Sequence, residues 1–558
     1  MKRTPERLTE REFDVLVVGG GIHGVLAAWD ASLRGMSVAL IEKGDFGAVT
    51  SQNSLRIIHG GLRYLQDGNP KRVRVMARER TTWMKMAPHL VHPLPCLMPS
   101  FKKFSRSRLA LGIALGANDL LSFDRNRLDD PQKTIHAGKT ISQREFAKLL
   151  PGYDASIVTG AALWNDGQIH NSERLILEFI LSAEQNGAEV ANYVEAVSFL
   201  REGNRVIGVR ARDILGSEEF DIRSRVVINC TGAWINQLLS GINTQRAPRQ
   251  EFALSVAIDL IVDQIWPRYA VGVPSHPDSK TRSQMLFFVP WRNKSLIGTW
   301  HIQWPNDPET FQITKMIIQD FIDEINSAHP KLNLSLNNVH HVHWGFLPVD
   351  PEDSRDEHVK LMRDSKVVDH LINYGLEGLI SIIGVKYTTA RASAEKAIDI
   401  ALIKLRAGSK ACRTETTPVY GGVIERFEDF LAMSIEEKGT ILDRDIIEHL
   451  VYTYGSGYQR ITEYIHEEPS MRERVDPNLP VILAEVVHAV REEMAQKLID
   501  VVQRRTEAGA TAVPPLAALT KCAAVMADEM GWDITRQEKE INEVLQAYPF
   551  KPAERMVA

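Results

Sequence analysis

The sequence predicts an α/β protein with two further parts, an antiparallel sheet and a C-terminal set of helices. Three observations predict it. A buried apolar strand at residues 14–18 leads into a glycine-rich turn and a helix, apolar strands recur within residues 250–340, and helical periodicity begins near residue 426. At 558 residues the chain is too long for one ordinary core, so we expect two or three domains.

The first unit, residues 14–42, consists of a strand, a glycine-rich turn, a helix and a second strand that ends in an acidic residue. Residues 14–18, DVLVV, form the strand, and GGGIHG at 19–24 matches GxGxxG. Gly19 permits the tight turn, Gly21 lets the backbone approach a pyrophosphate, and Gly24 lets helix and strand pack closely. The helix N-terminus offers free N–H groups and a positive dipole end to phosphates. This order predicts a Rossmann-like dinucleotide site.

An acidic residue completes this unit. Glu42 ends the second strand, SVALIE, 23 residues after Gly19. An acid at this tip accepts hydrogen bonds from ribose hydroxyls and disfavours a 2′-phosphate, so NADP is not expected. The unit alone does not separate FAD from NAD.

Three later segments favour FAD. Residues 43–66 supply short hydrogen-bonding side chains, and the sequence HGG at 59–61 lets the backbone lie close to a flat ligand. Residues 225–234, RVVINCTGAW, form a strand that enters a Thr-Gly turn. Residues 378–402 give a strand, a glycine turn at Gly384 and a helix. The N-terminus of that helix would stabilise negative charge on a reduced flavin ring.

Composition and targeting signals narrow the class of protein. The net charge of -5 argues against a nucleic-acid binder. The four cysteines lie far apart and predict reduced core thiols, and the charged N-terminus lacks the apolar stretch of a secretory signal. We expect a cytoplasmic protein. The apolar run LALGIALGA at 109–117 is too short to span a membrane, so it predicts a buried helix, with a membrane-surface contact as the alternative.

The histidines near residue 340 do not predict a metal site. His341 and His343 share one face of a predicted strand, but neither cysteines nor acids accompany them in the sequence. We therefore expect no metal.

Together these segments resemble the FAD-dependent glycerol-3-phosphate dehydrogenases, within the wider D-amino-acid-oxidase-like flavoprotein group. The similarity spans nearly the whole chain. It is carried by VVGGGIHG, EKGDFGAVTSQNS, IHGGLRYL, NDGQIHNSERLI, NCTGAWI, FFVPWRNKSLIGT, LMRDSKV, GVKYTTARASAEKAID and VVHAVREEMAQKLIDVVQRRTEAG. Of these, IHGGLRYL together with GVKYTTAR is far more specific than the glycine motif.

The resemblance implies three domains. These are an FAD-binding Rossmann-like (GR2-type) domain over residues 12–245 and 340–405, an antiparallel-sheet substrate domain over 246–339 and a C-terminal helical domain over 425–558. The cofactor-binding positions expected from the residues and the resemblance are Gly19, Gly21, Ile22, His23, Gly24, Glu42, Lys43, Thr50, Ser51, Ser54, His59, Gly60, Gly61, Leu62, Val194, Thr231, Gly232, Gly384, Lys386 and Thr388. We expect non-covalent FAD, because His23 lies in the phosphate loop and would point away from the isoalloxazine.

The resemblance also implies a reaction. The family oxidises sn-glycerol 3-phosphate to dihydroxyacetone phosphate, passing a hydride from C2 to flavin N5 and then electrons to membrane quinone. By matching motifs, Arg63, Tyr64, Arg363 and Lys386 fall at substrate-binding positions. His59, Arg63 and Lys386 form the expected catalytic set. The alternative for His59 is a structural histidine, and the alternative for Arg63 is a buried ion pair.

The expected partners follow from the same resemblance. They are a phosphorylated polyol or hydroxy acid and a quinone or other electron acceptor, with no nucleic acid. A homodimer and a peripheral contact with the inner face of the membrane are further alternatives.

The substrate side of the family pattern departs in several places. Leu347 stands where the family carries the arginine of a G-x-R-P-L stretch, and leucine cannot donate to a phosphate. Trp300 and His301 replace a Thr-Asp pair, and Val385 replaces a glycine. The departures favour either a different hydroxy or amino substrate or another cation, with Arg355 and His301 as candidates. A local shift of the motif alignment and a non-catalytic FAD-binding protein are the remaining alternatives.

Overall fold

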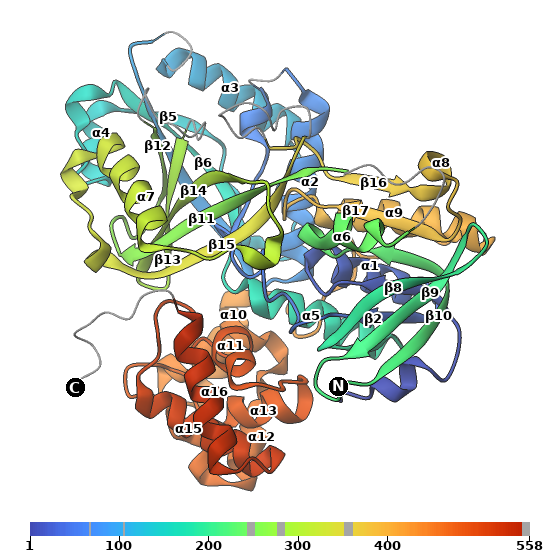
Figure 1. The fold of residues 1–558 in the computed structure, drawn as a ribbon. Coiled ribbons are helices and arrows are strands. Elements are labelled where there is room, and N and C mark those ends of the chain that lie inside the picture. Colours follow the sequence, from blue (N-terminus) through green and yellow to red (C-terminus); the bar gives the residue numbers. More distant parts are fainter. Residues whose placement is uncertain (66–67, 104–106, 243–250, 276–284, 351–360, 549–558) are drawn as a thin grey trace.

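The computed structural model describes residues 1–65, 68–103, 107–242, 251–275, 285–350 and 361–548. It contains two large sheets and a separate group of C-terminal helices (Figure 1). The α/β fold class expected from the sequence is therefore confirmed.

The first sheet is built around the N-terminal strand. Its order is β16 (Lys366–Asp369), β17 (Leu379–Ile383), β10 (Glu219–Asn229), β1 (Phe13–Val18), β2 (Val38–Ile41) and β7 (Glu189–Ala191). The pairs from β17 through to β7 are parallel, and β16 is antiparallel to β17. The strands β8 (Val194–Glu202) and β9 (Arg205–Asp213) extend β10 as an antiparallel meander. Such a parallel order leaves nucleotide-binding loops at the carboxyl ends of β1 and β10.

Three helices cover one face of this sheet. They are α1 (Ile22–Leu33), α5 (Ser172–Gln185) and α9 (Ala390–Leu405), and α1 contacts both of the others. Because α1 lies between the sheet and two helices, it is apolar on nearly every side and its Trp29 is fully buried against Phe179.

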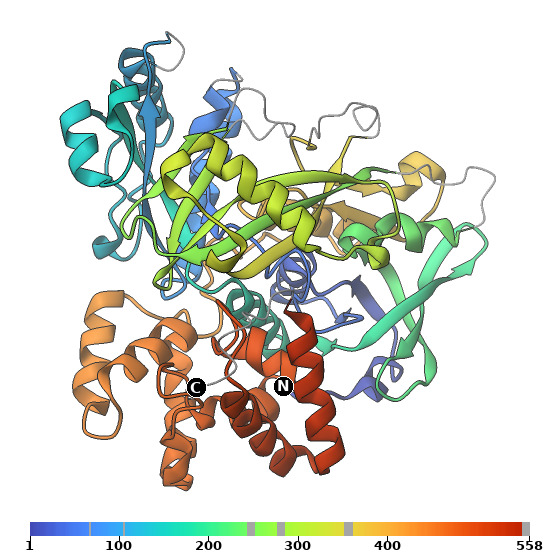
Figure 2. The same cartoon turned by 60° about the vertical axis from the view of Figure 1, so that its left-hand side comes forward.

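The second sheet draws its strands from two distant parts of the chain. Its order is β15 (Val339–Val349), β11 (Ala253–Asp263), β14 (Lys294–Trp304), β13 (Met285–Trp291), β12 (Ala270–Pro274), β4 (Val91–Ser100), β6 (Gly160–Ile169) and β3 (Ile57–Ile58), with β5 (Lys139–Ser142) beside β6. The sheet therefore includes strands from outside the range 246–339 expected for it, namely β3, β4, β5, β6 and most of β15. The helix α7 (Lys315–Ala328) packs on its outer face, and Figure 2 shows this helix in yellow-green across the sheet.

A further helix, α3 (Arg108–Leu121), carries the apolar run noted in the sequence. Leu111 and Leu115 are buried, but Leu109, Ile113 and Leu120 are each more than two thirds exposed. The expectation of a buried helix is therefore wrong for the face that carries these three side chains. Within the described residues, none of the helices combines the length and the hydropathy that crossing a bilayer requires.

The C-terminal helices lie below both sheets and are orange to red in Figures 1 and 2. They are α10 (Phe427–Lys438), α11 (Arg444–Tyr454), α12 (Tyr458–Glu467), α13 (Leu483–Glu492), α14 (Leu498–Asp500), α15 (Leu516–Met530) and α16 (Ile534–Ala547). They enclose two apolar clusters of their own, so this part has its own core.

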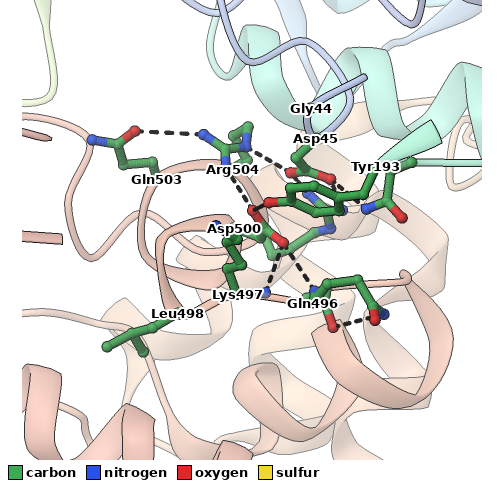
Figure 3. A network of polar contacts seen from close by, with 12 residues as sticks. Gly44, Asp45, Tyr193, Gln496, Lys497, Leu498, Asp500, Gln503 and Arg504 are labelled. Carbon is green, nitrogen blue, oxygen red and sulfur yellow. Dashed lines mark hydrogen bonds and ion pairs between the residues drawn. The ribbon is translucent and has the colours of Figure 1, made fainter. Parts of the chain in front are cut away.

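A buried ion cluster joins these helices to the first sheet (Figure 3). Asp45, in the loop after β2, accepts two hydrogen bonds of 2.7 Å from Arg505 and one of 2.6 Å from Arg504. Arg504 also donates to Asp500 at 2.7 Å, and Asp500 accepts the Tyr193 hydroxyl at 2.7 Å. Burial alone would raise the pKa of Asp45, but the two guanidinium groups hold this pKa well below its usual range.

The cluster predicts how far the free energy of unfolding falls when one of its charges is removed. Asp45→Asn keeps the side-chain shape but leaves Arg504 and Arg505 buried without their shared anion, so we expect a loss of about 3–5 kcal/mol. The midpoint of urea unfolding of the holoenzyme measures it. Glu448→Gln is the control, because its pair with Arg444 is exposed and contributes less than about 1 kcal/mol. Equal midpoints for Asp45→Asn and the wild type would contradict a role for this cluster in stability.

Candidate active site

A cavity of about 550 Å³ lies where the carboxyl ends of the first sheet meet the second sheet. The expected cofactor positions that line it are Gly19, Gly21, Ile22, His23, Glu42, Lys43, Thr50, Ser51, Ser54, Val194, Thr231, Gly232, Gly384 and Lys386. These positions come from segments far apart in the sequence, so the fold assembles one continuous pocket from the separate motifs.

Glu42 is fixed at one end of this cavity. Its two carboxylate oxygens accept hydrogen bonds from the amides of Gly20 at 2.6 Å and Gly44 at 2.8 Å. Burial raises the pKa of Glu42, and these two amide bonds act in the opposite direction. The backbone carbonyl of Glu42 also accepts the amide of Val194 at 2.8 Å. The carboxylate is therefore held at the tip of β2, where a ribose would meet it.

The glycine turn has the close contacts that its sequence predicts. Gly19 has φ +107°, and a Cβ on Gly24 would lie 1.9 Å from the Gly19 carbonyl oxygen. The helix α1 begins at Ile22, whose amide donates to Ser51 Oγ at 3.0 Å, and its N-cap residue, Gly21, has no side chain to accept from the next amides. The turn therefore presents a helix N-terminus to the cavity, which suits a pyrophosphate.

His23 lies between this turn and the Gly384 turn. A Cβ on Gly384 would come within 2.1 Å of the His23 ring, so only glycine leaves room for it. Burial lowers the pKa of His23 to about 4, so the imidazole is neutral at pH 7. The two turns that bracket the predicted cofactor are thus packed directly against each other.

The sequence HGG at 59–61 contacts protein rather than the cavity. A Cβ on Gly60 would meet the Arg80 guanidinium at 2.2 Å, and a Cβ on Gly61 would meet Met76 at 2.9 Å. The close approach that requires these glycines is therefore to the helix α2 (Pro70–Met86). The other expected cofactor positions outside the cavity lining are Gly24, His59, Leu62 and Thr388.

His59 is tied to the scaffold by both its backbone and its ring. Its amide donates to Thr388 Oγ1 at 3.0 Å, and its Nδ1 lies 3.2 Å from Asp166 Oδ2. Asp166 also accepts the Gly60 amide at 2.7 Å. These contacts fix the orientation of the ring, which suits both a structural histidine and a base, so the two alternatives for His59 stay open.

The residues expected to bind substrate gather around Tyr64. The Lys386 ammonium lies 4.8 Å from the centre of the Tyr64 ring, and the Arg72 guanidinium lies 4.2 Å from it. Lys386 and Arg72 both donate to the backbone carbonyl of Arg363. Arg63, next to Tyr64, is exposed, so the buried ion pair considered for it is not formed. Lys386 lines the cavity, and it connects the cavity to this cationic group.

Five residues of the second sheet line the cavity, and we call them the roof: Ala257, Asp259, Thr299, Phe346 and Leu347. On β11, Ala257 pairs with Gly345 of β15, and Ser255 pairs with Leu347. Leu347 therefore faces the cavity, so the departure from the family pattern lies at the site itself.

The replacements at Trp300 and His301 have different consequences. Trp300 points into the sheet's other face, where it stacks on Phe321 with 5.4 Å between ring centres. His301 shares the face of Thr299, but burial lowers its pKa to about 4. His301 therefore supplies no cation at neutral pH. The other candidate, Arg355, lies outside the described residues.

Asp259 is the roof residue that the sequence reasoning missed. Its signal was one acid inside the otherwise apolar strand ALSVAIDLIVD, on the same face as Ser255 and Ala257. Acids are rarely buried in such strands without a partner or a function, so the signal was available.

Comparison with known proteins agrees with this geometry. Residues 14–392 match the family model "FAD dependent oxidoreductase", and residues 412–537 match "C-terminal domain of alpha-glycerophosphate oxidase". A glycerol-3-phosphate dehydrogenase of Synechocystis sp. is 33% identical over 97% of this chain and 97% of its own. The chain belongs to the FAD-dependent glycerol-3-phosphate dehydrogenase family.

Other relatives extend over similar lengths. A glycerol-3-phosphate dehydrogenase of Mycobacterium leprae is 30% identical over 98% of this chain and 91% of its own. The solved structure of the Bacillus halodurans glycerol-3-phosphate dehydrogenase, complexed with FAD, has a TM-score of 0.76 at 23% identity, covering 99% of this chain and 97% of that one. That likeness shows the fold.

FAD is the cofactor that this family membership assigns to the chain, and the cavity fits it. Glu42 and the N-terminus of helix α1 suit a ribose and a pyrophosphate, and the Gly384 turn and Lys386 continue the cavity beneath the roof. When bound, FAD accepts two electrons as a hydride.

The glycine turn predicts a loss of FAD on a small substitution. In Gly24→Ala the new methyl would overlap the Gly19 carbonyl, and relieving that overlap costs about 1–3 kcal/mol. We therefore expect FAD affinity to fall roughly 10- to 100-fold. The ratio of flavin to protein absorbance after purification measures it. Gly116→Ala is the control, since a Cβ there meets nothing within 4 Å. Full FAD content in Gly24→Ala would show that the turn can shift without cost.

Proposed function

We propose that the protein oxidises sn-glycerol 3-phosphate to dihydroxyacetone phosphate, with hydride transfer from C2 to flavin N5 and passage of the electrons to quinone. The observation that carries the proposal is Lys386, which lines the cavity and contacts both Tyr64 and the Arg363 backbone. A phosphate needs cations within hydrogen-bonding reach, and Lys386 with the neighbouring Arg63 and Arg363 supplies them.

The remaining residues of the site serve the same reaction. In this proposal the roof limits the access of water to the space above the Gly384 turn, which strengthens the charged contacts inside it. FAD is held without a covalent bond in this proposal, because His23 belongs to the phosphate loop and its ring is buried against Gly384. The exposed apolar side chains of α3 support a peripheral membrane contact, where quinone would be reached.

The second candidate is a related oxidation of a different hydroxy or amino substrate. Leu347 on the cavity wall favours it, because a leucine there removes one donor that the family directs at the substrate. A protein that holds FAD without turnover is less well supported, since Lys386 still reaches the cavity.

Anaerobic mixing with glycerol 3-phosphate tests the proposal. We expect the visible band of the oxidised flavin to bleach in the wild type. Lys386→Met should weaken substrate binding about 10- to 100-fold, the loss expected when a charged hydrogen bond is removed. The measurement is the concentration dependence of bleaching in a stopped-flow spectrophotometer.

Lys396→Met is the matched control, because Lys396 is exposed on α9 and should leave the rate unchanged. A wild-type protein that dithionite reduces but glycerol 3-phosphate does not would favour the second candidate. Leu347→Arg would then be the variant with which to restore phosphate recognition.

A further inference from the structure

Asp259 presents a carboxyl to the cavity from the middle of β11. Its neighbours along the strand, Ile258 and Leu260, are fully buried on the opposite face, and Asp259 itself is 3% exposed. Thr299, on the adjacent strand β14, lines the same part of the cavity and forms a side-chain hydrogen bond with Asp259.

One oxygen of this carboxyl has no protein partner. Among the described residues no group forms a hydrogen bond with Asp259 Oδ1. The backbone of Gly298 leaves space for this oxygen, because a Cβ there would lie 1.8 Å from it. A buried acceptor without a partner costs most when the carboxyl is ionised, so this oxygen, which lies against the Gly298 backbone, favours the protonated acid in the absence of a ligand.

The groups that face Asp259 do not supply a free positive charge to balance its carboxylate. Arg56 lies near enough to favour the carboxylate, but it is bound to Glu173 at 2.7 and 2.8 Å. His343, its partner across β15, has a pKa well below the usual range because it is buried, and His301 of β14 is also neutral at pH 7. Lys386 lines the same cavity. Burial therefore dominates, and it raises the pKa of Asp259 to about 7.

We propose that Asp259 is the catalytic base of this enzyme: its carboxyl, on the cavity wall, accepts the hydrogen bond of the substrate hydroxyl and takes the hydroxyl proton during oxidation. The proposal rests on the proposed function, since it requires an alcohol substrate. The O–H bond breaks toward Asp259, which becomes protonated. The C–H bond breaks with its electron pair toward the flavin, and the carbon–oxygen bond becomes a carbonyl.

This assignment also orders the substrate in the cavity. The hydroxyl to be oxidised lies beneath Asp259, and the phosphate lies toward Lys386, so the two ends are recognised by groups of opposite charge. In this arrangement Leu347 contacts the carbon chain of the substrate rather than its phosphate. Leu347 lies two positions from Gly345 on the same face of β15.

The first test is Asp259→Asn in the holoenzyme, with flavin bleaching by glycerol 3-phosphate followed from pH 5 to 9. The wild-type rate should fall as pH decreases through about 7, because the base becomes protonated. Asp259→Asn should bleach roughly 10²- to 10⁴-fold more slowly and lose this pH dependence. Asp263→Asn is the control, an acid on the same strand whose side chain is 68% exposed.

Thr299→Val provides a second variant that keeps the carboxyl. The Thr299 hydrogen bond lowers the pKa of Asp259, so its removal should shift the acid limb of the rate to higher pH. Two results would overturn the assignment and leave the proposed function intact. One is an acid limb of the rate that does not shift in Thr299→Val, and the other is an acid limb that disappears in His59→Asn instead of Asp259→Asn.

Thermal unfolding tests the carboxyl without any substrate. Between about pH 4 and 7 the folded protein retains a proton that the unfolded chain has released, so Asp259 lowers stability as pH rises through this window. Asp259→Asn should therefore raise the unfolding temperature more at pH 8 than at pH 5, and Asp263→Asn should not. Equal shifts at both pH values would overturn the proposal for any substrate.

The outcomes separate this proposal from the proposed function. In one outcome another alcohol bleaches the flavin and glycerol 3-phosphate does not, with the acid limb of the rate still lost in Asp259→Asn. That result would change the proposed substrate and retain Asp259 as the base. Bleaching by amines and by no alcohol would overturn both.

Discussion

The buried cluster around Asp45 is the contact on which the cofactor end of the molecule depends. Asp45 follows Glu42 by three residues, so the loop that carries the acid expected to bind the ribose is held by Arg504 and Arg505 of the C-terminal helices. Tyr193, next to Val194 of the cavity wall, is tied to the same cluster through Asp500. The helical domain is therefore part of the scaffold of the active site, and a change in its packing would reach the cofactor before it reached the substrate.

The N-terminal unit could be predicted from the sequence because its physical requirements are local. The strand, the turn at Gly19, the contact between Gly24 and Gly19 and the acid at Glu42 all lie within a single βαβ segment. The strand at 379–383 was predictable for the same reason, since a short apolar run ended by a glycine needs no distant partner to be recognised.

The rest of the site depends on pairings between distant segments. The second sheet joins β4 to β12, and nothing in either strand's sequence specifies the other. The glycines at 60 and 61 were expected to approach a ligand, and the structure adds a requirement that the sequence did not reveal, since a Cβ at either position would meet α2. Asp259 carried a local signal, yet only the register with β14 and β15 gives it a cavity and leaves one oxygen free.

The roof combines a lost cation with a buried acid, and these two features belong to one electrostatic arrangement. An arginine at Leu347 would lie on the same face as Asp259 and would favour its carboxylate, which would lower the pKa of Asp259. With leucine there, burial outweighs the opposing effects of Thr299 and Arg56 and raises the pKa of Asp259 to about 7. Under the proposed function, leucine at this position removes one contact to a phosphate and leaves a group able to exchange a proton. The proposal then places the recognition of negative charge at the Lys386 end of the cavity and the recognition of a hydroxyl at the roof.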